Sequence, residues 1–539
     1  MEIAKLLRQG KTEEVWQKCC GFIDLSLEDF MKIQKRLLLE QLELMKGCEL
    51  GRYIVNGANP HNVEEFRERL PLTTYDDYAP YLLKQREDAL PEKPALWQYT
   101  SGKSGEYPFR WVPVTAEQLN EIAPLICAMI FFSGCTQRNE IVFKKHDKML
   151  YGMAPPPYAS GTMARVLPQG LLDFLPSIDK AEKMSFEERI QQGFELALSE
   201  GLDVCLALSS VAVAIGDRFQ QKGSNTTIKS LLQRPKAIPR LLRGLVKSKM
   251  AHRSLLPKDL WSLRGLITFG IDSSVFKEKI KETWGVEPLE FHGCTEAVLI
   301  AMQTWDHQAM TFIPYLNLFE FIPEEESIKS REDPAYQPST LLLDEVKPGN
   351  YELVITSLHG GPFVRYRLGH LIKITSLRNE QLNIDIPQMV FLSRVDDQID
   401  IAGFTRLSEK IIWQAIENTG LAYEDWAARK EVNDKPVLHL YIELKENGYV
   451  TAEQMAASVH EELRKLDAPY AELESFTGLR PLEVTLLPQN AFQSYKLRQQ
   501  ASRVDLTQLK PPHINPADDT IDFLVNDADK VMVKKKVKV

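Results

Sequence analysis

The chain has 539 residues, of which 44% are hydrophobic and 26% are charged, and its formal net charge is −9. This length exceeds what a single hydrophobic core supports, so we expect more than one domain. The negative charge disfavours a nucleic-acid partner, because a phosphate backbone binds basic surfaces. Seven cysteines without a C-x-x-C pair argue against both a disulfide framework and a zinc site.

The sequence predicts a cytoplasmic protein with no membrane span and no obligate protein partner. The N-terminal segment has no apolar signal core. The most apolar stretch, residues 204–215, is too short to cross a bilayer. Unpaired cysteines in a chain of this length suit a reducing compartment.

The pattern of elements predicts an α/β domain at the N-terminal side. Residues 1–95 have helical spacing, with Ser26 as the N-cap of one helix. Residues 204–215 are interpreted as a buried helix beside a pocket, and residues 151–161 as a stiff loop near one. Helical and strand patterns then alternate, and we expect strands at residues 95–99, 109–114, 263–269, 288–292, 319–322, 351–356 and 371–375.

A second, smaller α+β domain is predicted after residue 395, so that the domains are residues 1–395 and 396–539. Thr451 and Gln454 form a capping box for a helix ending at Leu466, and Gly420 suits the end of an earlier helix. Strands are expected at residues 437–444 and 482–487. The tail after Pro511 has weak periodicity and is interpreted as extended or loop structure.

The sharpest chemical signal is the segment Thr100-Ser101-Gly102-Lys103-Ser104-Gly105, which follows a predicted strand. Glycines let a backbone approach a phosphate, while hydroxyls and an ammonium group neutralise its charge. A Walker A loop would need glycine where Trp97 stands, and a helix rather than a strand afterwards. The segment is therefore a phosphate loop of another type or, taken alone, a polar hairpin turn.

Two further segments lie next to predicted strands, the first at the end of one and the second at the start of another. Phe291-His292-Gly293-Cys294-Thr295-Glu296 offers a hydroxyl and a carboxylate, oxygen ligands that suit Mg²⁺ bound with substrate phosphates. Its alternative reading is a helix start capped by Thr295. Tyr366-Arg367-Leu368-Gly369-His370 enters a strand and contains an arginine that could grip ribose or phosphate oxygens; alone it reads as a polar turn.

The last two segments lie at and beyond the predicted domain boundary. The stretch from Ser393 to Phe404 contains Arg394 and the pair Asp396 and Asp397, where a hinge would lie. Lys496 follows a short turn in the second domain, and a lone lysine of this kind is usually solvated.

In this order, the five segments resemble the adenylate-forming superfamily. Within it, the chain is similar to the GH3 group of acyl-acid amido synthetases, more to bacterial members than to plant ones. The stretches that carry this closer similarity are GGPFVRYRLGHLIKITSL and FLSRVDDQIDIAGFTRLSEKIIWQAIEN. The resemblance covers residues 10–510 and implies a large N-terminal domain that binds ATP and the acid, followed by a mobile C-terminal lid.

The resemblance also implies roles for single residues. Ser101, Gly102, Lys103, Ser104 and Gly105 would hold the β- and γ-phosphates of ATP. Thr295 would contact the α-phosphate, Glu296 would hold Mg²⁺, and Thr268 and Gly270 would form the adenine-binding turn. Arg394 would touch the ribose, Asp396 would be the hinge, and Lys496 would contact the carboxylate and the α-phosphate during adenylation.

Two positions depart from the superfamily pattern. Phe291 replaces a tyrosine, which removes a hydroxyl but keeps the ring. His370 stands where an aspartate grips both ribose hydroxyls, and a neutral imidazole has only one acceptor nitrogen. This change predicts weaker ATP binding.

The implied function is ATP-dependent activation of a small carboxylic acid as its acyl-adenylate, followed by transfer to an amine, commonly of an amino acid, to form an amide. Two alternatives remain open. One is an acyl-CoA ligase of the same superfamily. The other is a degenerate member that binds a nucleotide or metabolite without catalysis, which His370 favours and the phosphate loop, Glu296 and Lys496 disfavour.

Overall fold

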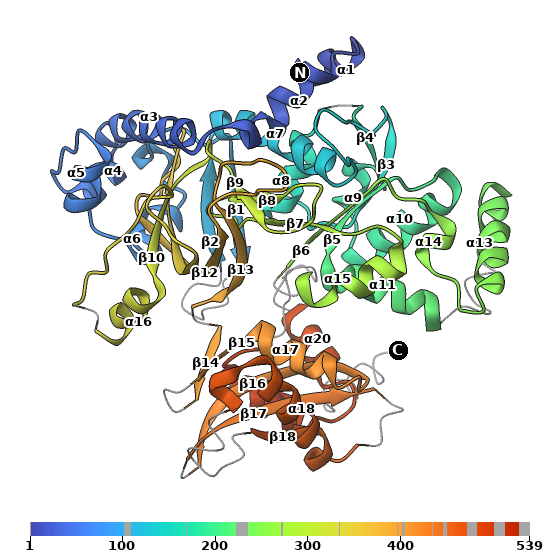
Figure 1. Cartoon of the computed structure of the whole chain (residues 1–539). Coiled ribbons are helices and arrows are strands. Elements are labelled where there is room, and N and C mark those ends of the chain that lie inside the picture. Colours follow the sequence, from blue (N-terminus) through green and yellow to red (C-terminus); the bar gives the residue numbers. More distant parts are fainter. Residues whose placement is uncertain are drawn as a thin grey trace. The chain divides into compact units, whose positions relative to one another are not determined.

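The computed structural model (Figure 1) describes the chain except residues 1, 102–108, 169, 222–234, 271–272, 334, 396, 402–404, 434, 446–449, 472–481, 501–512 and 528–539. The chain divides into two compact units, Met1–Phe391 and Leu392–Val539. Each unit has a hydrophobic core of its own. The α/β class with a large N-terminal and a separate C-terminal domain is thereby confirmed.

Helices open the large unit, as the sequence predicts. Ser26 caps α3, since its Oγ accepts a hydrogen bond from the Asp29 N–H at 3.1 Å. Buried Gln34 of α3 donates to the Asn317 carbonyl at 2.5 Å, which ties this helix to the sheet. The opening elements are α1 (Glu2–Arg8), α2 (Thr12–Cys20), η1 (Gly21–Asp24), α3 (Leu27–Lys46), α4 (Glu49–Val55), α5 (Val63–Arg69), α6 (Tyr75–Leu82) and η2 (Glu87–Ala89).

An eleven-stranded sheet forms the centre of the large unit, in the order β10-β11-β12-β13-β9-β8-β7-β6-β5-β3-β4. Strands β4, β3, β5, β6 and β7 run parallel to one another, whereas β7, β8, β9 and β13 pair antiparallel, as do β10, β11 and β12. The strands are β3 (Asp147–Tyr151), β4 (Leu172–Leu175), β5 (Val204–Leu208), β6 (Gly265–Phe269), β7 (Leu289–His292), β8 (Ala301–Gln303), β9 (Met310–Phe312), β10 (Asn317–Pro323), β11 (Gly349–Ser357), β12 (Tyr366–Ser376) and β13 (Gln388–Arg394).

Helices pack against this sheet, with α7 beside β6 to β8, α10 beside β3 and β4, and α11 beside β5 and β6. The helices of this part are α7 (Ala116–Phe132), α8 (Ala159–Val166), α9 (Ile178–Ala181), α10 (Phe186–Glu200), α11 (Ser209–Gln221), η3 (Pro235–Ala237), α13 (Ile238–Met250), α14 (Pro257–Leu260), α15 (Ser273–Trp284) and α16 (Glu324–Glu332). The prediction of one buried helix over residues 204–215 is wrong. Residues 204–208 form strand β5, which lies between β3 and β6, and α11 begins only at Ser209. A short apolar run does not distinguish a buried strand from a buried helix.

A separate antiparallel hairpin carries the predicted phosphate loop. It consists of β1 (Leu96–Ser101) and β2 (Phe109–Val114), with Ser101 opposite Phe109. The strands expected before and after the predicted phosphate loop are therefore present. Residues 102–108 lie outside the described part.

The small unit is an α+β domain. A hairpin of β14 (Gln398–Ile401) and β15 (Thr405–Ser408) precedes a three-stranded sheet of β16 (Tyr423–Asn433), β17 (Lys435–Leu444) and β18 (Leu482–Leu486). Its helices are α17 (Glu409–Asn418), α18 (Ala452–Leu466), α20 (Ala491–Gln500), α21 (Asp518–Asp522) and the π-helical turn η5 (Phe523–Asp527). The capping box of Thr451 and Gln454 begins α18 as predicted. The tail is not wholly irregular, since α21 forms within it.

Among the described residues, no helix combines the length and the apolarity needed to cross a bilayer.

Candidate active site

The turn after β7 is held in a strained conformation. A Cβ on Gly293 would lie 2.2 Å from the Val298 carbonyl oxygen, so only glycine fits there. Val298 itself has φ 60°, a left-handed conformation that a β-branched residue rarely adopts. The Val298 N–H donates to the Cys294 carbonyl at 2.7 Å, and the Ile300 N–H to the His292 carbonyl at 2.9 Å. Strain of this kind is concentrated at functional sites.

Thr295 and Glu296 lie on this turn, and both are half-buried. Within the described residues, neither side chain makes a hydrogen bond or an ion pair, so both oxygen groups are available to a ligand. Burial raises the pKa of Tyr366 on β12 well above its usual value, and the nearby negative charge of Glu296 raises it further. The carboxylate therefore lies close to the Tyr366 phenol.

The phosphate-loop hairpin reaches the same place. Arg110 of β2 stands opposite Thr100 of β1, one residue before the predicted loop begins. The positive charge of Arg110 lowers the pKa of the Tyr366 phenol, whereas the negative charge of Glu296 raises it. Two strands that flank the predicted phosphate loop thus end near the turn that carries Glu296.

His370 lies in a three-ring cluster at the strand ends. Its Nδ1 is 3.1 Å from Nε2 of His292, the last residue of β7. Phe391 of β13 stacks on His292 at 4.7 Å and packs edge-on against His370 at 5.6 Å. His370 is 5% exposed, so one of its two ring nitrogens is already engaged inside the protein.

The segment that contains His370 is a bulge within a strand and not an open turn. Leu353 of β11 pairs with His370 while Val354 pairs with Arg367, so two residues of β12 are left out of register. One of them, Gly369, has φ 66°. Arg367 makes a two-pronged ion pair with buried Glu352, at 2.8 and 2.6 Å, which gives this arginine a structural role.

The end of β6 forms the next part of the edge. The buried Thr268 hydroxyl has no hydrogen-bond partner among the described residues, an unusual state that a ligand or water could relieve. Phe269 packs on Phe291 at 5.7 Å. Gly270 has φ 133°, which excludes other residues, and its carbonyl accepts from the Ser273 hydroxyl at 3.2 Å.

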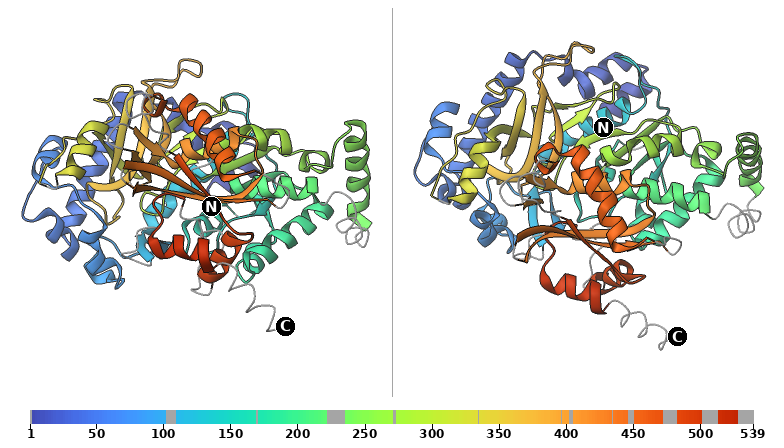
Figure 2. Two further views of the ribbon diagram at one scale, coloured as in Figure 1. Left: turned by 90° about the horizontal axis from the view of Figure 1, so that it is seen from below. Right: turned by 60° about the horizontal axis from the view of Figure 1, so that its bottom comes forward.

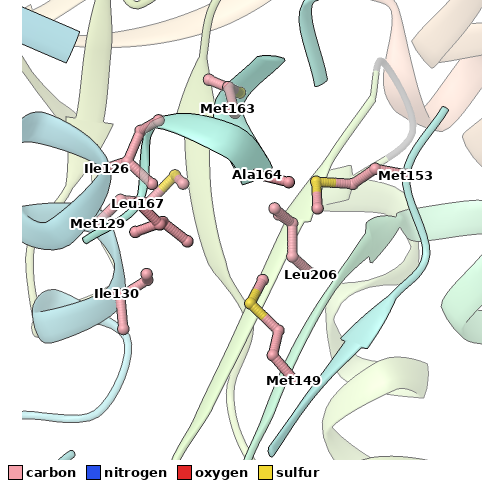
Figure 3. A pocket seen from close by; sticks show the side chains of 9 residues that line it. All are labelled: Ile126, Met129, Ile130, Met149, Met153, Met163, Ala164, Leu167 and Leu206. Carbon is pink, nitrogen blue, oxygen red and sulfur yellow. The ribbon is translucent and has the colours of Figure 1, made fainter. Parts of the chain in front are cut away.

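An apolar pocket lies beside these parallel strands (Figure 3), between α7, α8, β3 and β5. Its cavity volume is about 10 Å³, which is room for about one water molecule. Its lining is apolar throughout: Ile126, Met129, Ile130, Met149, Met153, Met163, Ala164, Leu167 and Leu206. Met153 belongs to the predicted stiff loop, and Leu206 to the segment expected to line a pocket.

In the small unit, Lys496 belongs to a chain of charged groups. Its Nζ lies 3.2 Å from Asp425 Oδ2. The other oxygen of Asp425 accepts from His513 Nε2 at 2.9 Å, and His513 Nδ1 donates to Glu409 Oε1 at 2.6 Å. His513 also stacks on Trp426, with ring centroids 4.5 Å apart and planes 6° apart.

The charge state of this chain follows from its contacts. Burial alone would lower the pKa of His513, but its hydrogen bonds to Asp425 and Glu409 prevail and raise it to about 9. Burial would raise the pKa of Asp425, yet His513 and Lys496 hold it below its usual value. At neutral pH His513 is therefore a cation, and Asp425 is an anion shared between two cations.

The structure brings together only part of the predicted site. Thr268, Gly270, Thr295, Glu296 and His370 lie on strands and turns of the large unit. Arg394 ends β13, which begins in the large unit and crosses the boundary at Leu392, and Lys496 lies in the small unit. Gly102, Lys103, Ser104, Gly105 and Asp396 lie outside the described residues. Sequence reasoning missed Glu409, Asp425 and His513, because the tail that supplies His513 has no clear periodicity.

The described residues contain no group of three or more side chains with the geometry of a protein metal cage. A lone carboxylate such as Glu296 still fits Mg²⁺, which proteins commonly bind through one or two carboxylates together with substrate phosphates.

Comparisons with known proteins place this geometry in a family. Three family models match in order: the GH3 N-terminal domain at residues 19–167, the GH3 central domain at residues 310–394 and the GH3 C-terminal domain at residues 409–518. A comparison with curated proteins finds no match.

Solved structures share the fold at low sequence identity. A GH3.15 acyl acid amido synthetase in complex with 2,4-DB is 16% identical, with a TM-score of 0.65 over 94% of this chain and 95% of the other. A 2-hydroxyisobutyryl-CoA ligase in the postadenylation state is 13% identical, with a TM-score of 0.55 over 97% and 91%. Because the three GH3 models cover more than half of the chain and extend through both units, this protein belongs to the GH3 family.

Proposed function

We propose that this protein is an ATP-dependent ligase that activates a carboxylic acid as its acyl-adenylate and transfers the acyl group to an amine, in particular that of an amino acid, forming an amide. The observation that carries the proposal is membership of the GH3 family across both units, together with the structural match to an acyl acid amido synthetase. The arrangement of Thr295 and Glu296 beside the phosphate-loop hairpin supports it.

We assign each part of the bound ATP to a separate set of residues. Ser101, Gly102, Lys103, Ser104 and Gly105 hold the outer phosphates of ATP, and Thr268 with Gly270 receives the adenine. Thr295 donates to the α-phosphate, and Glu296 holds Mg²⁺. When bound, Mg²⁺ neutralises charge on the phosphates. We assign His370 and Arg394 to the ribose, and Lys496 to the reacting carboxylate and the α-phosphate.

In the first step, a carboxylate oxygen of the acid attacks the α-phosphorus, and pyrophosphate leaves with the electron pair of the broken P–O bond. In the second, the amine attacks the acyl carbon, AMP leaves, and the amine loses a proton. The protein forms no covalent bond in this scheme, so positioning and charge stabilisation supply the rate. Lys103 would stabilise the departing pyrophosphate, and Lys496 the charge at the α-phosphate.

The pairing of Lys496 with Asp425 gives this lysine a resting place within the small unit. Asp425 offers it one oxygen at 3.2 Å, since His513 occupies the other, and the Lys496 side chain is 41% exposed. A single, partly exposed contact is weak and exchangeable. Lys496 can therefore leave Asp425 for a more highly charged partner when substrates are bound.

The apolar pocket suggests the class of acid. We propose that its wall opens to receive the apolar body of the substrate, since methionine side chains are adaptable in shape and the lining offers no polar partner. Ala164→Leu, which narrows the pocket, should shift preference towards smaller acids, whereas Ala181→Leu, at a buried alanine outside the pocket, should not. Equal acid profiles in the two variants would contradict this placement.

Coenzyme A is the second candidate acceptor, because the structure of a 2-hydroxyisobutyryl-CoA ligase also matches over most of the chain. After the same first step, the thiol of coenzyme A would attack the acyl carbon and lose its proton, AMP would leave, and the product would be a thioester. We also propose a cytoplasmic location. All seven cysteines are described and none forms a disulfide, which fits the reducing conditions there.

ATP–pyrophosphate exchange across a panel of carboxylic acids tests the proposal. We expect exchange that depends on one class of acid and on Mg²⁺. The mass of the product formed with amino acids or with coenzyme A then identifies the acceptor. Absence of exchange with every acid, combined with measurable ATP binding, would favour a nucleotide-binding protein without catalysis.

A further inference from the structure

One segment of this acidic chain is strongly basic. Between Asp217 and Asp259 the sequence contains eleven lysines and arginines and no acidic residue, although the whole chain has a net charge of −9. The segment includes helix α13 (Ile238–Met250). Nothing in the proposed reaction requires a basic surface here, because none of the proposed site residues belongs to this segment.

The inner face of α13 packs on the large unit. Leu241, Gly244 and Ser248 are buried, and the helix contacts α14 and η3. A Cβ on Gly244 would lie 2.7 Å from Leu260 Cδ2, so the packing there is close. Arg240 donates to the carbonyls of Ala197 and Leu198, which anchors the start of the helix.

The outer face of α13 exposes a stripe of large apolar side chains. Leu242 is 58% exposed, Val246 57% and Met250 77%. A spacing of four residues places them on one side of the helix, one above another. Most large apolar side chains of this protein are buried, and three exposed in a row on one helix form a patch of the kind that marks an interaction site.

Basic side chains flank the stripe. At 100° per residue, Arg243 and Lys249 fall on opposite edges of the stripe. Lys247 lies on the same side as Arg243 but farther from the stripe. In the part of the chain that the structure describes, none of the three is in an ion pair with a carboxylate. Their charges are therefore available to an external anionic partner. Arg253, just beyond the helix, is instead neutralised by Asp259 at 2.7 Å.

The helix is also accessible. In each of the views of Figures 1 and 2, α13 stands at the margin of the large unit, beyond α10 and α14.

We propose that α13 is a membrane-surface anchor that lies in the plane of an anionic bilayer, with Leu242, Val246 and Met250 inserted among the acyl chains. A bilayer surface offers an apolar layer directly beneath anionic headgroups, which matches an apolar stripe with cations on both edges. An acidic protein surface would satisfy the cations but would leave the three apolar side chains without an apolar layer to enter. The site of adenylation lies elsewhere in the chain, so this inference is independent of the proposed function.

Sedimentation of the full chain with lipid vesicles tests the proposal. We expect binding to vesicles of phosphatidylcholine mixed with phosphatidylserine, weaker binding to phosphatidylcholine alone, and loss of binding as salt is raised. Each basic residue near an anionic surface strengthens binding about five-fold, so R243Q/K247Q/K249Q should weaken it by about two orders of magnitude. L242S/V246S/M250S should abolish binding at any salt concentration.

Matched variants on other surfaces are the controls. K32Q/R36Q/K46Q removes three cations from α3, and Y53S/L83S/L377S removes three exposed apolar side chains elsewhere; both should bind like the wild type. Thermal unfolding of each variant shows that it remains folded. Failure of the wild type to bind anionic vesicles, or unchanged binding by either α13 variant, would overturn the proposal. So would an α13 variant that lowers the molar mass of the lipid-free protein, because a second copy would then cover the stripe.

Discussion

The two units hold their proposed reactive groups in opposite ways. In the large unit, Thr295 and Glu296 lie on a turn fixed by Gly293 and by the left-handed Val298, and their side chains have no partner among the described residues. In the small unit, Lys496 is bound to Asp425, which is itself held by His513.

The difference suggests a division of labour. A rigid turn with unpaired oxygen groups is ready to bind phosphate and a hard cation without rearranging. A lysine that rests on a shared carboxylate keeps its charge compensated until a stronger anion replaces Asp425. Substitutions in either group test this contrast.

The largest effect is expected from Lys496→Ala. Loss of one charge that acts at the transition state should cost about 2–4 kcal/mol, or roughly 10²–10³ in the rate of adenylation. ATP binding should change little, because the contact matters most when charge develops. Pyrophosphate-exchange kinetics of the variant measure the adenylation rate, and ATP titration measures ATP binding. Lys465→Ala, which removes a surface lysine from α18, is the control, and equal kinetics in the two variants would make Lys496 an ordinary surface lysine.

His513 should make the stability of the small unit depend on pH. Its pKa rises from 6.5 to about 9 on folding, so its contribution is complete below pH 6.5 and is lost as the pH rises through 9. The shift corresponds to about 3 kcal/mol. The free energy of unfolding, measured with denaturant, should therefore fall more between pH 6.5 and 9.5 in the wild type than in His513→Gln. Parallel pH profiles would show that His513 is not charged in the folded protein.

Glu296→Gln should raise the Mg²⁺ concentration needed for exchange by roughly 10–100-fold, since a contact to a charged group contributes about 1.5–3 kcal/mol. Glu380→Gln, on the surface, is the control. A variant that needs no more Mg²⁺ than the wild type would remove Glu296 from the metal site and leave it as part of a helix-like turn.

The smallest effect is expected from His370→Asp. An aspartate could accept both ribose hydroxyls, so we predict a KM for ATP lower by about 5–30-fold, or about 1–2 kcal/mol. The contact of His370 with His292 complicates this substitution, because the new carboxylate could pair with His292 instead. His292→Gln, combined with His370→Asp, removes that competitor. A KM that does not fall in either variant would show that residue 370 only orders the strand ends.

Sequence patterns predicted most of the fold because its strands and caps have local signals. β2 occupies the predicted residues 109–114, and Thr451 with Gln454 begins α18 as expected. The prediction of one helix over residues 204–215 is wrong because a continuous apolar run has neither the helical nor the strand periodicity. The bulge at Gly369 was read as a turn, since a register shift depends on the partner strand β11.

The candidate site was less accessible to sequence reasoning. Thr295 and Glu296 could be selected because a turn after a buried strand predicts exposed ligands. The contact between His292 and His370 joins residues 78 positions apart, and the chain from Lys496 to Glu409 draws on three separate segments. Such contacts follow from tertiary packing and leave no local pattern.

Transfer of a labelled oxygen from the acid to AMP tests whether the protein forms an acyl-adenylate. With an acid whose carboxylate carries ¹⁸O, attack on the α-phosphorus leaves one labelled oxygen on AMP after the acyl group has been transferred. We predict AMP that carries one ¹⁸O atom and pyrophosphate that carries none. Label in inorganic phosphate, with unlabelled AMP or ADP, would show attack at another phosphorus and would contradict the acyl-adenylate account.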